Sequence, residues 1–599
     1  MKKCVLVLAA LYHLSLGAQC PINGIAFTSQ AAIDNFPSVY PNCTTIGTGS
    51  IRVSGPDIVS LAGLHNIVSI SGSSLLVFNN PLLTNLDGLE QLSTVGLYVR
   101  IFNNPALTDI DGLQGLESIG RDLQLSDNPA LISLSGLNNL QSVNGSLFIW
   151  NNDALTNLHG LENLASIAND LSVIGNDALQ SLGDFSSLDS IGRNLQLSTN
   201  ESLTDISGLA EVQDIGGDLI LVHNNNLEDL HGLEGLSVLH NDLEIGNNEK
   251  LVNLANLANL EQIKGNFRLR DNPLLGSLAG LDQLSSIHGN LSITDNSGLL
   301  NLQGAPQLSE LGSLLVDGNV ALNSLSGMEQ LMELPDGLAV LNNPLLTNLS
   351  GLANLESVGN LVISQNAALA DLGGLDNLSL VQGELSIYDN PALETLHGLE
   401  ALTATGGVYM ADNGTLSSLS GIDNLLQING FLILEDNPAL ATLAAFEQLQ
   451  SIAGRLTIRN NSNLPDCAAQ GICNYLANPQ GTVIVQNNLS GCNSIPEVEM
   501  ACETVATEEV KPMLSAQLFP NPVGASTVVN LVADLGALAN QSATLRLHNA
   551  LGSELSSEPL QIIDGKVQQE LAIGTFPTGL YFCTIETDGG VIWQGKLVK

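Results

Sequence analysis

An asparagine that recurs at nearly constant spacing constrains the fold of this chain more than any other feature. An Asn-x-x-Leu motif recurs in phase at 17 anchor positions, and the spacing between successive anchors is 24 in 13 of the 16 intervals and 23 in the other three. Counting back by one such interval from Leu75 and Val77 reaches Ile51 and Val53, so one further coil begins the array. The anchor asparagines are Asn80, Asn104, Asn128, Asn152, Asn176, Asn200, Asn224, Asn248, Asn272, Asn296, Asn319, Asn343, Asn366, Asn390, Asn413, Asn437 and Asn461.

The aliphatic rhythm inside one repeat excludes a helix and favours a bent, extended chain. Steps of three residues drift by about 60° each time on a helix, so such residues would not share one face. A pair with period two is typical of a strand with one buried face. Each repeat therefore predicts one coil with three short sides, and about 18 coils stack into an all-β solenoid. In the unit after Asn104 these residues are Leu107, Ile110, Leu113, Leu116, Ile119, Leu123 and Leu125.

Glycine placement indicates where each coil bends. A glycine precedes the third aliphatic residue in 13 of the 17 units, and the exceptions are Asp184, Asn256, Ala445 and Ala469. Asp and Asn tolerate positive φ better than most residues, so we interpret this position as a bend with positive φ. The anchor asparagines are predicted to be structural, because stacked amides can form a ladder from coil to coil.

The unit L-x-L-x-x-N-P-x-L-x-x-L-x-G-L-x-x-L-x-x-I resembles the receptor L-domain repeat, a relative of leucine-rich repeats. The resemblance covers about residues 20–502, although the leucine after the asparagine comes one residue later than in leucine-rich repeats. It implies a right-handed β-helix or leucine-rich-repeat-like solenoid, here residues 51–464, that binds ligands, often at a cell surface.

The N-terminal segment indicates export. Residues 1–18 have a positive start at Lys2 and Lys3, a short apolar run and a small-residue end, which is typical of a signal peptide. The apolar run is too short to span a bilayer, and no later run is long enough. A lipid anchor on Cys20 is the alternative, which Gln19 disfavours, since a small residue is needed at that position.

Six of the seven cysteines that follow the signal peptide lie at the two ends of the array. In an exported chain this placement favours disulfides that close an N-terminal cap, residues 19–50, and a C-terminal cap, residues 465–502. A zinc site is the alternative, but there is no Cys-x-x-Cys pair and no histidine nearby. The last four cysteines allow three pairings, of which we favour Cys467–Cys492 and Cys473–Cys502, and Cys583 is left over. The cap cysteines are Cys20, Cys43, Cys467, Cys473, Cys492 and Cys502.

A short helix is expected in the N-terminal cap, from Ser29 to Phe36 with Ser29 as its N-cap. After the array, residues 503–514 are predicted to be a linker. Residues 515–599 contain alternating polar and apolar runs between glycine turns, which predicts a small antiparallel β-sandwich.

Three motifs of this last segment resemble the C-terminal sorting domain of type IX secretion substrates. The resemblance implies the secretion machinery as a partner, passage through a Gram-negative periplasm, and a secreted or outer-surface location. A permanent adhesive domain is the alternative. The motifs are FPNP (Phe519, Pro520, Asn521, Pro522), TGLYF with Gly579 and Tyr581, and GKLVK with Lys596.

Charge restricts the partners further. The chain has 60 Asp and Glu against 17 Lys and Arg, a formal net charge of −43. Nucleic acids and anionic membranes need basic surfaces, so neither is expected as a partner.

Clustered aromatic residues are the strongest binding signal, because aromatics are only 4 % of the chain. Their phase in the repeat places them on the outward side of the strands, where rings could stack on a glycan or on apolar groups of a protein. The alternative is that aromatic residues simply suit strands. The predicted ligand-binding residues are Phe78, Tyr98, Arg100, Phe102, Phe148 and Trp150, and a second cluster contains Tyr388, Tyr409 and Phe431.

The sequence contains no clear arrangement of catalytic residues. Arg268 and Arg270 would suit a β-helical polysaccharide-active enzyme, but Glu244 lies one coil below Arg268 and predicts a cross-strand ion pair. The histidines are scattered, and no calcium-loop spacing occurs, so we expect no catalytic residues, no metal and no cofactor. The sequence therefore predicts a secreted or surface-displayed ligand-binding or adhesion protein, not an enzyme. A structural rod and a polysaccharide-active enzyme remain as alternatives.

Overall fold

The computed structural model describes residues 20–21, 23–507, 515–519, 528–534, 542–549, 553–560, 566–587 and 590–599. The chain divides into two compact units, Met1–Cys502 and Glu503–Lys599. The predicted signal peptide and the motif residues Pro520, Asn521 and Pro522 lie outside the described residues.

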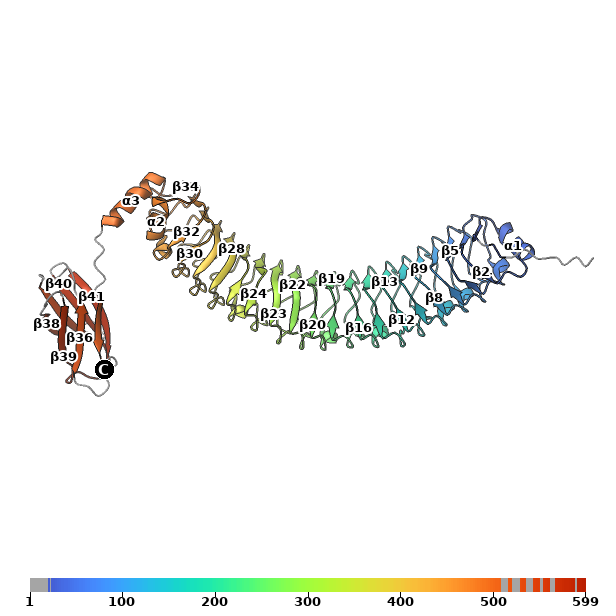
Figure 1. The fold of residues 1–599 in the computed structure, drawn as a ribbon, viewed down its shortest axis with the longest axis horizontal. Helices are drawn as coiled ribbons and strands as arrows, with labels where there is room; N and C mark the ends of the chain where they lie inside the picture. The colour runs from blue at the N-terminus through green and yellow to red at the C-terminus, as the bar shows by residue number, and fades with distance from the viewer. Residues whose placement is uncertain are drawn as a thin grey trace, which may run out of the picture. The chain divides into compact units, whose positions relative to one another are not determined.

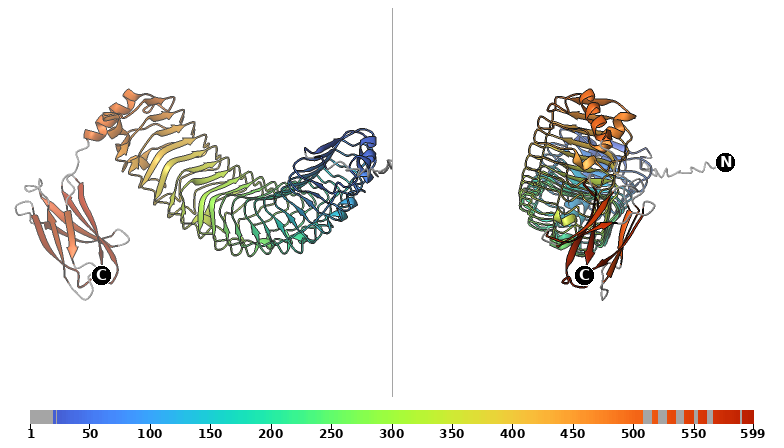
Figure 2. Two further views of the ribbon diagram at one scale, coloured as in Figure 1. Left: turned by 45° about the vertical axis from the view of Figure 1, so that its right-hand side comes forward. Right: turned by 90° about the vertical axis from the view of Figure 1, so that its left-hand side faces the viewer.

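The first unit is a β-solenoid of about 19 turns, which confirms the predicted fold class. Its strands are parallel and form two columns, and each strand pairs with the equivalent strand one repeat away, as Leu147 does with Leu171. The unit is bent into an arc (Figures 1 and 2), and Figure 1 shows labelled strands of the first column, such as β9 and β13, along its concave edge and labelled strands of the second column, such as β12 and β16, along its convex edge.

The first column contains the longer strands. They are β1 (Ile25–Phe27), β3 (Ile51–Val53), β5 (Leu75–Phe78), β7 (Val99–Phe102), β9 (Leu123–Ser126), β11 (Leu147–Trp150), β13 (Leu171–Ile174), β15 (Leu195–Ser198), β17 (Leu219–Val222), β19 (Leu243–Gly246), β21 (Phe267–Arg270), β25 (Gly337–Leu341), β27 (Leu361–Ser364), β31 (Leu432–Glu435), β33 (Leu456–Arg459) and β34 (Val483–Gln486). Four strands run through both columns, namely β22 (Ser286–Thr294), β23 (Glu310–Asp317), β28 (Leu380–Tyr388) and β29 (Ala404–Ala411).

The second column consists of two-residue strands. They are β2 (Thr45–Ile46), β4 (Ser69–Ile70), β6 (Thr94–Val95), β8 (Ser118–Ile119), β10 (Ser142–Val143), β12 (Ser166–Ile167), β14 (Ser190–Ile191), β16 (Asp214–Ile215), β18 (Val238–Leu239), β20 (Gln262–Ile263), β24 (Glu333–Leu334), β26 (Ser357–Val358), β30 (Gln427–Ile428) and β32 (Ser451–Ile452).

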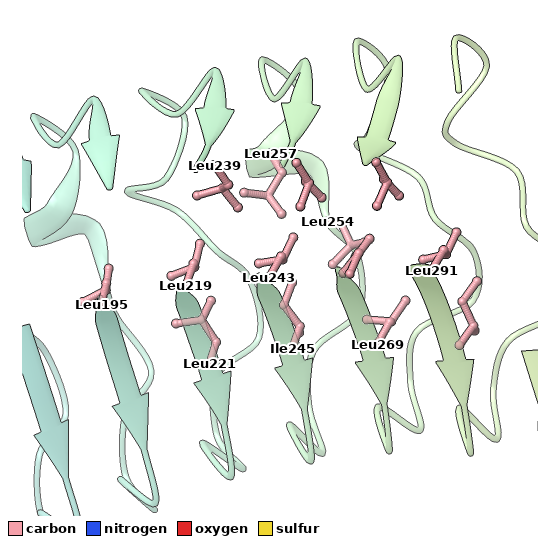
Figure 3. Packing of buried hydrophobic residues seen from close by; sticks show 14 of the residues in the cluster. Leu195, Leu219, Leu221, Leu239, Leu243, Ile245, Leu254, Leu257, Leu269 and Leu291 are labelled. Carbon is pink, nitrogen blue, oxygen red and sulfur yellow. The ribbon is translucent and has the colours of Figure 1, made fainter. Parts of the chain in front are cut away.

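The aliphatic residues of each coil point into one continuous core. Within the unit after Asn104, the residues from Leu107 to Leu125 that set the rhythm are all fully buried. Figure 3 shows the same leucine positions of neighbouring coils stacked on one another, for example Leu195, Leu219 and Leu243. Full burial of one such side chain contributes about 1.5–3 kcal/mol, so the repeating rhythm is the main source of stability.

The third side of the coil is irregular and contains the glycine that precedes the third aliphatic residue of most repeats. Our interpretation that this position requires positive φ is only partly correct. Nine of the 13 glycines have positive φ, but Gly112, Gly136, Gly208 and Gly351 lie in 3₁₀ turns without it, and neither Asp184 nor Asn256 has positive φ. The feature that these glycines share is close packing, since a Cβ at Gly136 would lie 1.9 Å from the carbonyl oxygen of Ile110 one coil below. The 3₁₀ turns are η1 (Ala62–Leu64), η2 (Asp111–Leu113), η3 (Ser135–Leu137), η4 (Ser207–Leu209), η5 (Ala255–Leu257), η6 (Ser350–Leu352) and η7 (Ala444–Phe446).

The anchor asparagines form the predicted ladder, and all 17 are fully buried. The backbone N–H of each anchor donates to the side-chain oxygen of the anchor in the next coil, as Asn104 does to Asn128 at 3.1 Å. The ladder continues one step further than the sequence indicated, because Asn461 donates to Asn488 Oδ1 at 2.9 Å across an interval of 27 residues.

Helices and disulfides close both ends of the solenoid. Helix α1 (Gln30–Val39) covers the first coil with Ile33 and Phe36, but the Ser29 side chain makes no capping bond. Instead, the first helical N–H, that of Gln30, donates to Asp57 Oδ2 at 3.3 Å, because the next coil brings this carboxylate to the helix start. The disulfide Cys20–Cys43 joins this cap.

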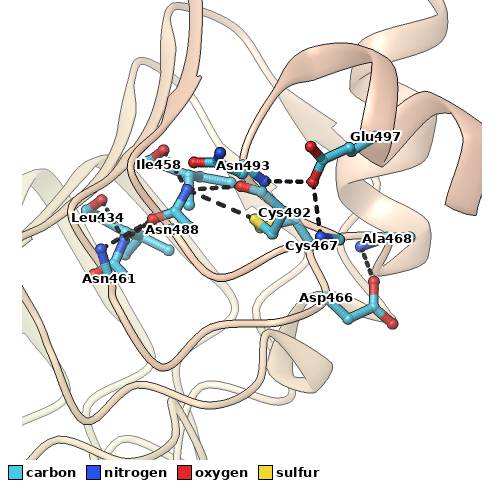
Figure 4. Close-up of a disulfide and its surroundings, with 11 residues drawn as sticks. Leu434, Ile458, Asn461, Asp466, Cys467, Ala468, Asn488, Cys492, Asn493 and Glu497 are labelled. Carbon is cyan, nitrogen blue, oxygen red and sulfur yellow. Dashed lines mark hydrogen bonds between the residues drawn. A yellow bond between two sulfur atoms is a disulfide. The ribbon is translucent and has the colours of Figure 1, made fainter.

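At the other end lie helices α2 (Gln470–Ala477) and α3 (Ile495–Thr507), so α3 extends five residues into the segment predicted as a linker. Disulfides join Cys467 to Cys492 and Cys473 to Cys502, which is the pairing that the sequence favoured. Figure 4 shows how the asparagine ladder reaches the first of these disulfides, since Asn488 donates from Nδ2 to the carbonyl oxygen of Cys492 at 2.9 Å.

The second unit contains two antiparallel sheets around one small core. The first sheet has the order β35 (Ser515–Phe519), β36 (Val528–Asp534), β39 (Lys566–Ala572), and the second has the order β38 (Glu554–Leu560), β37 (Ala543–Asn549), β40 (Leu580–Thr587), β41 (Gly590–Val598). Side chains of both sheets, such as Leu531 and Ile585, share one buried cluster, as in a β-sandwich.

Candidate ligand-binding face of the solenoid

The outward side of the first column, which we call the outer face, carries three rows of side chains. In each coil, the residue just before the first buried residue of the strand belongs to the leading row, the second strand residue to the middle row and the fourth to the trailing row. The register stacks each row over the next coil, so Leu76 pairs with Arg100 in the middle row and Phe78 with Phe102 in the trailing row.

The outer face collects almost every aromatic residue that the core does not use. Residues 51–464 contain eleven aromatic residues. Phe185, Phe267 and Phe446 are fully buried in the core. The other eight all lie on the outer face, and no strand of the second column contains one. They are Phe78, Tyr98, Phe102, Phe148, Trp150, Tyr388, Tyr409 and Phe431.

Near the N-terminal end, the predicted residues come together as a packed aromatic patch. The rings of Phe78 and Phe102 stack with centroids 5.0 Å apart and planes at 5°. Phe148 and Trp150 have centroids 4.7 Å apart. Ser126, which lies between Phe102 and Trp150 in the trailing row, is only 2 % exposed, so the rings enclose the short side chain between them.

The two other predicted residues of this patch bind each other. The guanidinium carbon of Arg100 lies 4.6 Å from the centroid of the Tyr98 ring, and Arg121 donates to the Tyr98 hydroxyl at 3.4 Å. Arg100 also lies 3.9 Å from Asp122. This edge of the patch therefore combines a ring with two cations.

Around the second aromatic cluster, the outer face is hollowed. We call this hollow, of about 470 Å³, the trough. Its middle row has short side chains, Ile433 and Thr457, which are only 6 % and 7 % exposed although they point outward. They form the floor because longer side chains stand on both sides of them.

The two sides of the trough follow from the register. The leading row supplies Phe431 and Arg455, and the trailing row supplies Glu435 and Arg459. Tyr409, a middle-row residue, closes the end nearer the N-terminus, one coil before Ile433. Glu384 and Ile484 complete the lining.

A polar network fixes the trailing side of the trough. Arg459 donates from Nε to Glu435 Oε2 at 2.7 Å, and the Tyr409 hydroxyl donates to Glu435 Oε1 at 3.4 Å. Partial burial, together with the nearby Glu435 carboxylate, raises the pKa of Tyr409. On the leading side, the guanidinium carbon of Arg455 lies 5.5 Å from the Phe431 ring centroid, and no carboxylate among the described residues forms an ion pair with Arg455.

Between the two clusters, the leading row is occupied by structural acids and amides. The backbone N–H of Asn266 donates to Asp242 Oδ1 at 2.7 Å, and that of Asp242 donates to Asp218 Oδ1 at 3.1 Å. This second ladder was missed because its positions vary between Asp, Asn and Ser. It makes the middle of the outer face part of the scaffold.

The ion pairs near this ladder differ from the prediction. The register places Glu244 beside Arg268, but Arg268 donates to Asp242 Oδ2 at 2.6 Å, while Arg270 donates to Glu244 Oε1 at 2.8 Å. The predicted Glu244–Arg268 pair is therefore wrong. The Asn266 N–H already holds the Asp242 carboxylate toward the next coil, so the long Arg268 side chain reaches back two residues to it.

Three histidines that occupy the same position of the repeat each lie beside a glutamate on the surface. His231 lies 2.7 Å from Glu234 and His397 lies 2.6 Å from Glu400, and each glutamate also accepts a backbone N–H from the intervening glycine. The hydrogen bond to the glutamate raises the pKa of both His231 and His397. Among the residues that the structure describes, no group of three His, Cys, Asp or Glu side chains is placed to hold a metal ion.

The sorting-motif residues of the second unit are structural where they are described. Phe519 ends β35, and the Gly579 N–H donates to the Lys599 carbonyl at 2.8 Å. The Tyr581 hydroxyl donates to the Pro577 carbonyl, and Lys596 lies opposite Phe582 in the β40–β41 pair.

Comparison with known proteins identifies this second unit. Residues 517–599 match the model of the secretion system C-terminal sorting domain. The chain is therefore exported through the type IX system to the cell surface or the surroundings. No curated protein and no solved structure matches the chain. In the described part of the chain, no helix has the length and apolar character needed to cross a membrane.

Proposed function

We propose that this exported protein binds an extracellular glycan or protein with the outer face of its solenoid and does not catalyse a reaction. The observation that carries the proposal is the sorting of aromatic residues, because all eight that the core of residues 51–464 leaves free lie on this one face. Rings that remain partly exposed on a rigid surface are typical of contact sites, where they supply apolar area at low entropic cost.

The distribution argues against a purely structural explanation. If aromatic residues were present only because they suit strands, both columns would contain them. The second column has equally regular parallel strands, and its outward positions are mostly Ser, Thr, Asp, Glu and Gln. A structural rod, which needs only the core and the ladders, gives no reason for this asymmetry.

The arrangement of charges favours binding over catalysis. Arg268 and Arg270, the arginines that a polysaccharide-active enzyme would use, are each paired with a carboxylate of the preceding coil. An arginine engaged in this way is held by the scaffold and is not directed toward a substrate.

The test is a binding screen of the purified protein on arrays of glycans and extracellular proteins. The double variant Phe102→Ala/Trp150→Ala should lose signal on any ligand that binds the aromatic patch. Ile132→Ala, which removes an exposed aliphatic side chain outside the outer face, is the matched control and should retain it. If no array component binds the unaltered protein, the rod is favoured, and turnover of an acidic polysaccharide would favour the enzyme.

A further inference from the structure

The trough differs from the rest of the outer face because it offers an apolar floor and fixed polar groups in one hollow. Ile433 and the Tyr409 and Phe431 rings provide apolar surface, while Glu435 is held by Arg459 and by the Tyr409 hydroxyl. The hollow of about 470 Å³ lies within the range of sites for small ligands, roughly 300–1,000 Å³. A sugar ring has the matching chemistry, with an apolar C–H face and a rim of hydroxyl groups.

Arg455 adds a charge preference to this site. Four other arginines of the outer face have a carboxylate partner, namely Arg100, Arg268, Arg270 and Arg459, whereas Arg52, at the far end of the solenoid, forms no ion pair among the described residues. Arg455 lines the trough with its guanidinium carbon 5.5 Å from the Phe431 ring centroid, and among the described residues it forms no ion pair with a carboxylate. A guanidinium binds a carboxylate through two parallel hydrogen bonds.

The net charge of −43 does not prevent an anion from binding beside Arg455. Salt screens distant charges beyond about 8–10 Å, so the ligand experiences mainly the groups that line the trough. These are two arginines and the acids Glu384 and Glu435, of which Glu435 is already paired. An anion can therefore approach from the Arg455 side.

We propose that the trough binds a carboxylated sugar residue of a glycan, with Arg455 holding the carboxylate and the Tyr409–Phe431–Ile433 surface holding the ring. This inference rests on the proposed function, since it assigns one ligand class to one part of the outer face. The Thr457 hydroxyl and the Glu435 carboxylate also line the trough, where they would form hydrogen bonds with the hydroxyl groups of the sugar. Uronic acids and sialic acids share this chemistry, and the experiment distinguishes them.

The experiment is titration calorimetry of the full exported chain with four probes: galacturonate trimer, sialyllactose, and the uncharged galactotriose and lactose. We expect one acidic probe to bind at least about tenfold more tightly than its uncharged counterpart, as a hydrogen-bonded charge pair implies. This preference should decrease as the salt concentration rises.

Two variants locate the binding, and a third is the matched control. Arg455→Gln should abolish the preference for the acidic probe. Thr457→Phe should fill the floor and abolish binding altogether, and the fold should tolerate it because the middle row already contains Phe148 and Tyr409 in other coils. Arg52→Gln removes an exposed middle-row arginine far from the trough, so it should change nothing.

The outcomes separate this inference from the broader proposal. If acidic and uncharged probes bind equally, or if Thr457→Phe binds as well as the unaltered chain, the trough assignment is overturned. If a ligand is then lost only in Phe102→Ala/Trp150→Ala, the outer face still binds and the proposed function stands. If no probe and no array component binds, both proposals fail.

Discussion

Asn104 donates from its side-chain nitrogen to the side-chain oxygen of Asn128 at 3.2 Å, although the two residues are 24 positions apart. The same nitrogen also donates to the carbonyl oxygens of Val77 and Phe102 at 3.1 Å each. One buried amide therefore joins three successive coils, and the repeated contact sets the distance and register between them.

Replacing this amide should weaken the solenoid markedly. Asn104→Ala leaves the buried backbone N–H of Asn80 without its acceptor and removes one of the two acceptors of Asn80 Nδ2, and an unpaired buried group costs about 1–3 kcal/mol. We expect the free energy of unfolding, measured in urea, to fall by at least about 2 kcal/mol. Asn138→Ala, at an exposed position in the neighbouring coil, should change it by less than about 0.5 kcal/mol. Equal effects would contradict the ladder's role.

Close stacking of the coils predicts a sharp difference between two glycines. Gly160 has φ 116° and a Cβ there would lie 2.1 Å from the carbonyl oxygen of Leu134. Gly160→Ala should therefore destabilise the protein by about 1–3 kcal/mol from backbone strain alone, with the clash in addition. At Gly414 a Cβ meets nothing within 4 Å, so Gly414→Ala should be neutral or stabilise by up to about 1 kcal/mol. Thermal unfolding of both variants measures this, and a tolerated Gly160→Ala would refute the packing argument.

The C-terminal cap should open locally when its disulfide is removed. Cys467–Cys492 closes a segment of 25 residues, for which the loss is about 3 kcal/mol. Because solenoid coils contact only their neighbours, Cys467→Ser/Cys492→Ser should raise hydrogen exchange in β33 and β34 and leave β13 to β17 unchanged. Uniform protection throughout the variant would show that the disulfide is dispensable.

The surface pair of His231 and Glu234 should be visible in a titration. The hydrogen bond to Glu234 raises the pKa of His231, and, although burial acts in the opposite direction, this bond and others lower the pKa of Glu234. Stabilisation from the histidine is present below its unfolded pKa of about 6.5 and is lost as pH rises through the folded pKa. Stabilisation from the glutamate is lost as pH falls through its lowered pKa.

Nuclear magnetic resonance titration of the imidazole should give a pKa above about 6.5 for His231. Glu234→Gln should return it toward that value while leaving the raised pKa of His397 as it is, because His397 has its own glutamate in a distant coil. An unchanged His231 in this variant would show that Glu234 is not the cause.

Cys583 offers a probe of the sorting unit. It is the unpaired cysteine of the described residues, it is fully buried, and burial raises its pKa to about 12. At pH 8 it should therefore resist a thiol reagent until the unit unfolds, because the thiolate is the reactive form. Labelling followed against denaturant would report the unfolding of this unit, and rapid labelling of the folded protein would contradict the burial.

Several local inferences failed for reasons that involve a neighbouring coil. Ser29 occupies the N-cap position, but the first N–H of the helix donates to the carboxylate of Asp57. Nothing in the sequence near the helix indicates that Asp57 lies there. The recurrence of glycine before the third aliphatic residue was attributed to positive φ. The structure shows that the carbonyl groups of the coil below leave no room for a Cβ at this position, whether φ is positive or negative. The partner of Arg268 was taken from register alone, although Asn266 had already oriented another carboxylate toward it.

The sequence by itself determined the solenoid, the ladder, the disulfide-closed ends and the sorting domain. The solenoid and the ladder follow from residue types that recur at a fixed interval, whereas the disulfides follow from the placement of the cysteines and the sorting domain from three motifs. The sequence also placed the aromatic residues on the outward side of the strands, but the tertiary structure alone decided where this face is hollowed. Ile433 and Thr457 form a floor only because longer side chains from the rows on either side rise around them, and neighbours on this face are a whole repeat apart in the chain. Such a surface depends on differences in side-chain length between adjacent coils, which no local pattern expresses.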